Sequence, residues 1–335
     1  MPDHRASGRF LTACAITIAI TALSVLVSEG IARVILEKRS PHLKERMILV
    51  PFDNSCAALG AKPGLDKIVV LGSSPAMVET VHNRPFPDQL RERLAERFDV
   101  LFIRAGGIDS SLNVLEAEMA ARCGWRTRYF IVYAGHQDFN AAYREKCGVV
   151  FPAVRPSPGW RDFAAAWLLN HSSTIRLLTA TALRTQNRHV APERSGCLFT
   201  FSQDDLRGLL ARYEGNMRRI IRAARAIGAR TILVTQILDP SRTSRESAQF
   251  CGMQNEALRR LARRNPDVDV VDFELAAAPR VRKKDGGCGL FETSPEPGRC
   301  GDPYHLSLAG HEIVADLLGK RLMKDEAPSR LGPRR

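Results

Sequence analysis

Two short segments near opposite ends of the chain carry residues that could together activate a serine. Gly72-Ser73-Ser74-Pro75 follows a short apolar run, and Asp302-Pro-Tyr-His305 precedes a segment with helical apolar spacing. An aspartate three residues before a histidine can orient the imidazole and stabilise its protonated form, so that the other ring nitrogen accepts a proton from a serine. The pair of segments predicts nucleophilic catalysis with His305 as base and Asp302 as its orienting acid. Taken alone, Gly-Ser-Ser-Pro is also an ordinary turn sequence.

The elements that would position these residues alternate between strands and helices. Strands are predicted at 67–71, 100–103, 128–134, 231–236 and 268–273, and helices at 87–98, 111–122, 203–227, 244–263 and 311–322. This alternation predicts a three-layer α/β/α domain around a central, mostly parallel five-stranded sheet of the flavodoxin-like kind. Because ligands of open α/β sheets bind at the carboxyl ends of strands, a serine directly after the first strand is well placed for chemistry.

Four blocks of the sequence, in this order, resemble the motifs of the SGNH, or GDSL, hydrolase superfamily. They are Gly72-Ser73-Ser74, Arg104-Ala-Gly-Gly107, Gly135-His136-Gln137-Asp138-Phe139 and Asp302-Pro-Tyr-His305. The resemblance puts the nucleophile at Ser74, with Ser73 as the alternative if the turn is shifted by one residue. It covers most of the chain after about residue 65.

The same resemblance implies an oxyanion hole. Gly107, which we choose over the adjacent Gly106, would contribute its backbone N–H, and Gln137 would contribute its side-chain amide. The family carries Asn where this chain has Gln137, and the loss of one oxyanion donor typically lowers turnover about 10²–10³-fold. Ser73, His136 and Asp138 are further candidates for contact with substrate.

The resemblance implies hydrolysis of an acyl ester by a Ser74–His305–Asp302 triad, without a metal or an organic cofactor. The expected substrate is an acylated carbohydrate, such as an O-acetylated polysaccharide, or a lipid of the cell envelope. Two alternatives stay open. The same serine could transfer its acyl group to a sugar hydroxyl, or the domain could be a degenerate SGNH-like binding domain, which Ser73 and Gln137 favour slightly.

The composition is strongly basic. The 335 residues contain 49 Lys and Arg against 36 Asp and Glu, a net charge of +13, and the sequence pI is about 9.7. Because arginines are spread over several helices and both tails, and no zinc-finger or helix-turn-helix pattern occurs, we do not expect a nucleic-acid partner. The charge instead predicts a solvated basic surface near anionic lipid headgroups or polysaccharide.

The N-terminal region predicts a membrane anchor. Residues 10–27 carry no charge, and with their neighbours they are long enough to cross a bilayer, so we expect a short tail at 1–9, a transmembrane signal anchor at 10–30 and a linker at 31–66. More basic residues follow this segment than precede it, which on the positive-inside rule alone favours a cytoplasmic domain. We nevertheless expect the domain on the periplasmic side, because of its cysteines and because membrane-anchored relatives of this type are commonly exported.

Eight cysteines occur, and none forms a Cys-x-x-Cys pair, so zinc and thioredoxin-type sites are not expected. Cys288 and Cys300 flank the loop before Asp302, where a disulfide would brace the segment that carries the base.

The hydrolase-like domain is expected to span 67–323 with an insertion at about 148–202, which we interpret as a lid or recognition segment. Residues 324–335 are predicted to form a disordered basic tail.

Overall fold

The computed structural model describes residues 17, 20–21, 23–35, 56, 61–77, 84–104, 109–147, 172–175, 178, 199–239, 241–281, 289–291 and 303–326. The chain divides into two compact units. One comprises residues 1–49 and 158–191, and the other comprises residues 50–157 and 192–335. The second unit holds the sheet and the candidate site.

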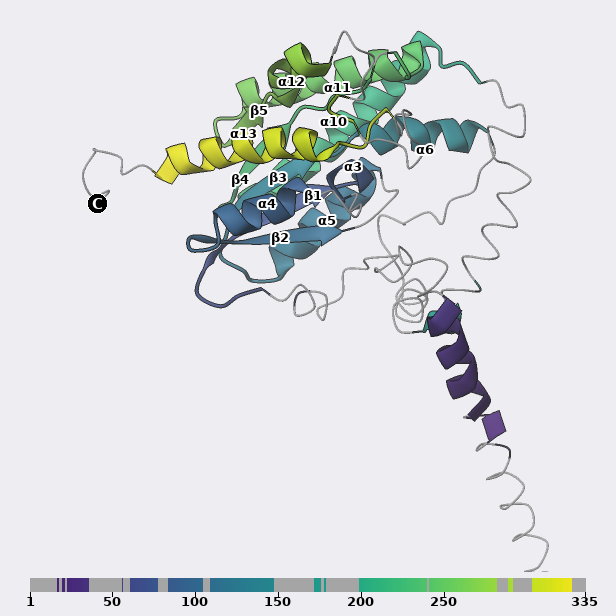
Figure 1. Ribbon diagram of the computed structural model, residues 1–335. Coiled ribbons are helices and arrows are strands. Elements are labelled where there is room, and N and C mark those ends of the chain that lie inside the picture. Colours follow the sequence, from purple (N-terminus) through teal and green to yellow (C-terminus); the bar gives the residue numbers. More distant parts are fainter. Residues whose placement is uncertain are drawn as a thin grey trace, which may run out of the picture. The chain divides into compact units, whose positions relative to one another are not determined.

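A five-stranded parallel sheet forms the centre of the second unit (Figure 1). Its strands are β1 (Asp66–Gly72), β2 (Phe98–Arg104), β3 (Thr127–Tyr133), β4 (Arg230–Val234) and β5 (Val268–Val271). Their order across the sheet is β2-β1-β3-β4-β5, and each neighbouring pair is parallel. All five predicted strands are present, and the flavodoxin-like order is the one expected for this class.

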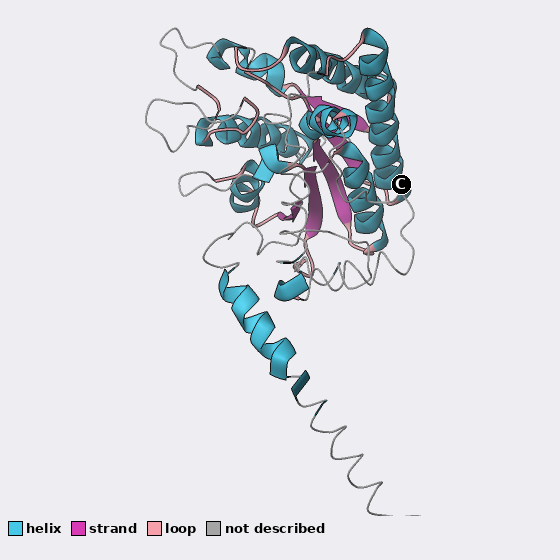
Figure 2. Ribbon diagram, turned by 90° about the vertical axis from the view of Figure 1, so that its right-hand side faces the viewer, coloured by secondary structure: helices cyan, strands magenta, loops and turns pink. Residues whose placement is uncertain are grey.

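Helices cover both faces of the sheet (Figure 2). On one face lie α4 (Phe86–Arg93), α12 (Phe273–Val281) and α13 (Leu308–Glu326), whose apolar side chains share a single core cluster with the strands. On the other face lie α5 (Ser110–Arg122), α10 (Gln203–Ala226) and α11 (Arg245–Arg264). The predicted three-layer architecture is therefore confirmed.

The central strand β1 is apolar on both faces. Ile68 and Val70 belong to the core cluster under α4 and α13, and the alternating residues Val69 and Leu71 point to the opposite layer. All four side chains are fully buried. A continuous apolar run is what a parallel strand with both faces covered requires, which is why the sequence indicated this strand clearly.

Three helices were not predicted from the sequence. They are α3 (Ser74–Met77), α6 (His136–Lys146) and α12. The helix α12 contains Pro279, a residue that usually ends a helical pattern, and α6 begins within a polar stretch that has no clear apolar stripe. The final helix α13 also continues to Glu326, beyond residue 322 where we expected its end, through residues that favour helix.

In the first unit, residues 23–35 are helical and expose large apolar side chains that include Leu23, Leu26 and Ile31. Glu29 on this helix accepts hydrogen bonds from the backbone N–H groups of Ser173 (2.6 Å) and Thr174 (3.1 Å). The insertion is thus joined to the N-terminal helix through one carboxylate at the start of a helical turn.

No helix in the described ranges is both long enough and apolar enough to cross a bilayer. The predicted anchor at 10–30 is described only in part, so it stays a prediction. Most of the predicted insertion at about 148–202 and the predicted tail from residue 327 onward lie outside the described residues.

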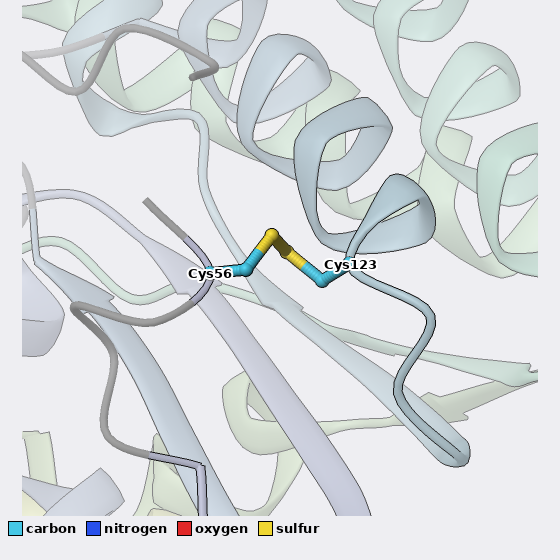
Figure 3. Close-up of a disulfide and its surroundings, with 2 residues drawn as sticks. All are labelled: Cys56 and Cys123. Atoms are coloured by element: carbon cyan, nitrogen blue, oxygen red, sulfur yellow. A yellow bond between two sulfur atoms is a disulfide. The ribbon is translucent and has the colours of Figure 1, made fainter. Parts of the chain in front are cut away.

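A disulfide joins Cys56, which precedes β1, to Cys123 at the carboxyl end of α5 (Figure 3). Their Cα atoms are 5.4 Å apart. Cys147 is also disulfide-bonded, whereas Cys251 is a free, buried thiol. The predicted pair of Cys288 and Cys300 lies outside the described residues. Disulfides of this kind persist in oxidising compartments.

Candidate functional site

The candidate site lies where the chain leaves β1 and β3. In the order β2-β1-β3-β4-β5, the connections from β1 and β3 run to opposite sides of the sheet, so the gap between these two strands is the topological switch point. Ligands of open α/β sheets bind at this point, outside the carboxyl ends of the strands. Ser73 and Ser74 directly follow β1, and residues 135–137 follow β3. Two of the four motif blocks therefore flank the place where the fold binds ligands.

The turn after β1 is tight. A Cβ atom on Gly72 would lie 2.8 Å from the Cβ of Ala76 and 3.2 Å from the carbonyl oxygen of Tyr133, so glycine permits the close approach. The backbone N–H of Ala76 donates to the carbonyl of Ser73 (2.9 Å), which starts the short helix α3. Ser74 is the first residue of α3, and its side chain lies outside the described structure.

Ser73 faces inward at this turn. Its side chain is 1% exposed, and its hydroxyl has no hydrogen-bond partner within the described part of the chain. A buried hydroxyl is poorly placed to contact a bulky substrate directly, and the assignment of the nucleophile to Ser74 stays a prediction.

The turn after β3 is held by side chains from three other elements. Gly135 has a φ of 135°, a region that favours glycine. The carbonyl of Ala134 accepts hydrogen bonds from the Tyr213 hydroxyl (3.0 Å) and from the Gln236 amide, and the carbonyl of Gly135 accepts one from the Gln254 amide (3.1 Å). These buried donors fix the backbone that leads directly into Gln137.

Asn255 completes this support. Its side-chain oxygen accepts from the backbone N–H of Gln236 (2.8 Å), and its side-chain nitrogen donates to the carbonyl of the same residue (2.8 Å). The sequence did not identify Tyr213, Gln236, Gln254 or Asn255 as site residues. A signal was present, because Gln254 and Asn255 occupy buried positions on the otherwise apolar face of α11.

His136 and Gln137 begin α6, and both side chains are 7% exposed. The Nε2 atom of His136 lies 3.2 Å from the carbonyl oxygen of Ile237, so it acts as a donor to the backbone after β4. His136 is therefore held by the protein, and its predicted contact with substrate stays a prediction. Gln137 is the second residue of α6, and its oxyanion role stays a prediction.

Asp138 is 1% exposed and bound to the start of α5. Its two carboxylate oxygens accept hydrogen bonds from the backbone N–H (3.0 Å) and the hydroxyl (2.5 Å) of Ser110, which also accepts from Asn216 (2.9 Å). Burial raises the pKa of Asp138 to about 7, although the bonds from Ser110 oppose this rise. The described contacts give Asp138 a structural role, and its predicted contact with substrate remains untested.

The fourth block lies against the exits of β3 and β4. The carbonyl of Pro303 accepts a hydrogen bond from the backbone N–H of Asp239 (3.0 Å), and the ring centroid of Tyr304 is 6.5 Å from that of His136. His305 follows, with its ring centroid 5.8 Å from that of Tyr304. The structure thus brings the His305 segment to the same edge as the third block. Asp302 and Gly107 lie outside the described residues.

A second histidine, His311, is buried close behind His305. The backbone N–H of Phe86 donates to its Nδ1 atom (3.3 Å), which assigns the proton of the neutral ring to Nε2. Burial, together with the charge of His305, lowers the pKa of His311 to about 3. His311 therefore stays neutral over the range in which a catalytic histidine would gain and lose a proton.

A small cavity of about 10 Å³ opens beside the β3 turn, lined by residues that include Gly135, His136 and Tyr304. This volume is about that of one water-sized probe. Among the residues whose placement is described, no group of His, Cys, Asp and Glu side chains is arranged to hold a metal ion.

No protein-family model matches the sequence, and no curated protein matches it. A solved structure of a Bacillus subtilis protein aligns at 15% identity over 79% of this chain and 58% of that chain, with a TM-score of 0.45. A putative acylhydrolase from Bacteroides fragilis aligns at 13% identity, covering 82% and 94% of the two chains (TM-score 0.45). A GDSL-like lipase from Bacteroides thetaiotaomicron aligns at 11% identity, covering 81% and 96% (TM-score 0.45). The chain spans somewhat more than half of the first of these proteins.

Proposed function

We propose that this chain is an SGNH-type serine ester hydrolase. The observation that carries the proposal is the convergence of three motif blocks at one edge of the sheet. The serines follow β1, residues 135–137 follow the neighbouring strand β3, and the segment that ends in His305 contacts the exits of β3 and β4. These blocks are far apart in sequence, so their convergence supports a shared chemical role.

In the proposed reaction, the Ser74 hydroxyl attacks the carbonyl carbon of an acyl ester while the imidazole of His305 takes its proton. Asp302 orients the imidazole and stabilises its positive charge. Collapse of the tetrahedral intermediate expels the alcohol, which receives the proton from His305. Water, activated in turn by His305, then hydrolyses the acyl-serine and restores the free hydroxyl.

The proposed oxyanion donors are the backbone N–H of Gly107 and the side-chain amide of Gln137. The rigid turn before α6 supports this role for Gln137, because Tyr213, Gln236 and Gln254 all hold the backbone immediately before it. A fixed turn allows a donor with one extra methylene to be aimed reproducibly at a developing charge.

We further propose that the substrate is an acyl ester of the cell envelope, either an O-acetylated polysaccharide or a lipid. A p-nitrophenyl ester series separates the two. A kcat/KM that is highest for acetate and falls with chain length supports the polysaccharide, and a kcat/KM that rises with chain length supports the lipid.

The nucleophile is tested by reacting the full chain, in mild detergent, with a fluorophosphonate probe. Wild type and Ser73→Ala are expected to be labelled, whereas Ser74→Ala and His305→Ala are expected to lose labelling. Circular dichroism of each variant verifies that the fold is intact. Loss of labelling in Ser73→Ala alone would move the nucleophile to Ser73.

The two alternatives are separated by product analysis. The protein would be an acyltransferase if Ser74 were labelled by the probe and esters were not hydrolysed, but an acyl group were transferred to an added glycan. If folded wild type were not labelled and bound an acetylated glycan as tightly as Ser74→Ala, the domain would be a binding domain and the proposal would fail.

We also propose that residues 10–30 anchor the chain in a membrane with the domain on the periplasmic side. The Cys56–Cys123 disulfide supports an oxidising compartment, and the exposed apolar side chains of residues 23–34 support contact with lipid. Alkaline phosphatase fused after residue 326 is active only when exported. Activity of that fusion in intact cells is expected, and an inactive fusion would favour the cytoplasmic orientation that the flanking charges indicate.

A further inference from the structure

The outer face of α10 and α11 carries a groove of about 340 Å³, which we call the basic groove. Its lining includes five arginines, namely Arg218, Arg222, Arg225, Arg260 and Arg264, and one carboxylate in the described structure, Glu214. These residues lie in the later turns of helices that lead into β4 and β5. The basic groove is thus toward the amino edge of the sheet, opposite the edge that carries the candidate site.

Carboxylates neutralise only part of the positive charge of the basic groove. Glu214 is shared between Arg218 and Arg260, each at 2.6 Å, and Arg225 pairs with Asp267 (2.7 Å) next to the groove. Arg222 and Arg264 have no carboxylate partner within the described ranges and are exposed. At least two guanidinium groups therefore remain available to an anion, and each offers a planar pair of donors that matches a carboxylate.

The spacing of these arginines costs helix stability. Arg218, Arg222 and Arg225 lie four and three residues apart on α10, and Arg260 and Arg264 lie four apart on α11. Like charges at these spacings repel each other on a helix. The negative carbonyl ends of the helices attract Arg225 and Arg264, but this attraction falls off within the last turn and does not account for the earlier arginines. A bound polyanion would remove the repulsion.

We propose that the basic groove binds a linear polysaccharide that carries carboxylate groups. The side chains of Ile221, Ala257 and Leu261 close its floor and are buried, so the arginines supply the contacts that the groove offers to a ligand. No aromatic side chain lines it in the described structure, whereas single-stranded nucleic acids are held by stacking on aromatic rings. The groove is concave, which suits a chain polymer better than a flat lipid surface. The proposal is independent of ester hydrolysis at the other edge.

The test uses the full chain in mild detergent, titrated with polygalacturonate and followed by affinity electrophoresis. The variant Arg222→Gln/Arg264→Gln is expected to weaken binding about tenfold or more, because two charge-assisted contacts are lost. The matched control Arg207→Gln/Arg263→Gln removes the same charge from the same helices outside the groove, and is expected to change affinity less than about twofold. Glu214→Gln, which releases Arg218 and Arg260, is expected to strengthen binding.

Thermal unfolding of the groove variant supplies a second readout. Since it removes like-charge repulsion, its melting temperature should equal or exceed that of wild type. If the control variant weakened polygalacturonate binding as much as the groove variant, the proposal would be overturned, because the polymer would then be attracted by the net charge of the protein and not by the groove. Binding of a single-stranded oligonucleotide or of phosphatidylglycerol vesicles more tightly than polygalacturonate would overturn the assignment to a polysaccharide. Retention of the protein by neutral dextran, or its failure to be retained by polygalacturonate, would overturn the assignment as well.

Discussion

Asp138 and Ser110 form a buried pair in which one carboxylate accepts both the backbone N–H and the hydroxyl of a single serine. The pair joins the first turn of α6 to the first turn of α5, two helices that follow different strands. Because Asn216 on α10 donates to the same hydroxyl, three helices meet at this point. The residue that follows the candidate oxyanion donor Gln137 therefore ties its turn to the rest of the domain.

Replacing Asp138 tests this linkage. Asp138→Ala leaves the N–H and hydroxyl of Ser110 without acceptors, so unfolding in urea at pH 5 should show a loss of about 1–3 kcal/mol. Asp138→Asn keeps an acceptor of the same shape and should lose much less. Equal losses for the two variants would indicate that the hydrogen bonds contribute little.

The pH dependence of stability should differ between wild type and Asp138→Asn. In the folded state the pKa of Asp138 is about 7, above its ordinary value of 3.8, so the folded protein holds a proton that the unfolded chain has released. The stability that this proton contributes is complete below pH 3.8 and is lost as pH rises through 7. The difference in unfolding free energy between the two proteins, measured from pH 4 to pH 8, should follow this window.

The ionisation of His311 should change stability with pH in the opposite direction to that of Asp138. Its folded pKa of about 3 lies below the ordinary 6.5, so the unfolded chain binds the extra proton, and stability present above pH 6.5 is lost as pH falls toward 3. His311→Asn keeps an acceptor for the Phe86 N–H and cannot ionise. Its free energy of unfolding, measured in urea from pH 4 to pH 7, should therefore depend less on acid than that of wild type. An unchanged slope would contradict a buried neutral imidazole.

Gly135→Ala should both destabilise the domain and impair the proposed activity. A Cβ atom there would be 2.8 Å from the Gln254 amide nitrogen and would also meet the Gln236 amide, at a φ of 135°. We expect a loss of at least about 2 kcal/mol and a fall in kcat for any ester that wild type hydrolyses. Gly228→Ala is the control, because a Cβ there meets open space at a φ of 73°. Similar losses of stability in both variants would mean that the cost comes from the backbone conformation and not from the contacts with Gln236 and Gln254.

The Cys56–Cys123 disulfide closes a loop with a sequence separation of 67, so its removal should cost about 4 kcal/mol. Cys56→Ser, Cys123→Ser and the double variant should unfold at the same urea concentration, since each removes the same bond. A double variant less stable than either single one would show that the cysteines also contribute separately.

The strands of the sheet and most of the helices could be predicted from the sequence because the patterns that indicate them are local. Strands such as β1 are continuous apolar runs, and the long helices α10 and α11 carry clear amphipathic spacing. The helix α6 was missed because its first turn is polar, and its burial depends on neighbours such as Phe201 and Phe250 that are distant in sequence.

The support of the β3 turn could not be read from the sequence in the same way. The residues that hold Ala134 and Gly135 are 79, 102 and 119 positions away from them, and each donates a side-chain hydrogen bond that no local pattern encodes. The sequence singled out the serines, Gln137 and His305 because they belong to short motifs. Their chemistry stays a prediction, and the contacts that position the β3 turn are seen only in the structure.

The Cys56–Cys123 bond also determines how mechanical load would enter the domain. If the chain is anchored through its N-terminal region, as we propose, tension on that region reaches Cys56 before it reaches β1, and the disulfide passes part of it covalently to the carboxyl end of α5. The strand that precedes the candidate nucleophile then does not carry the whole load alone.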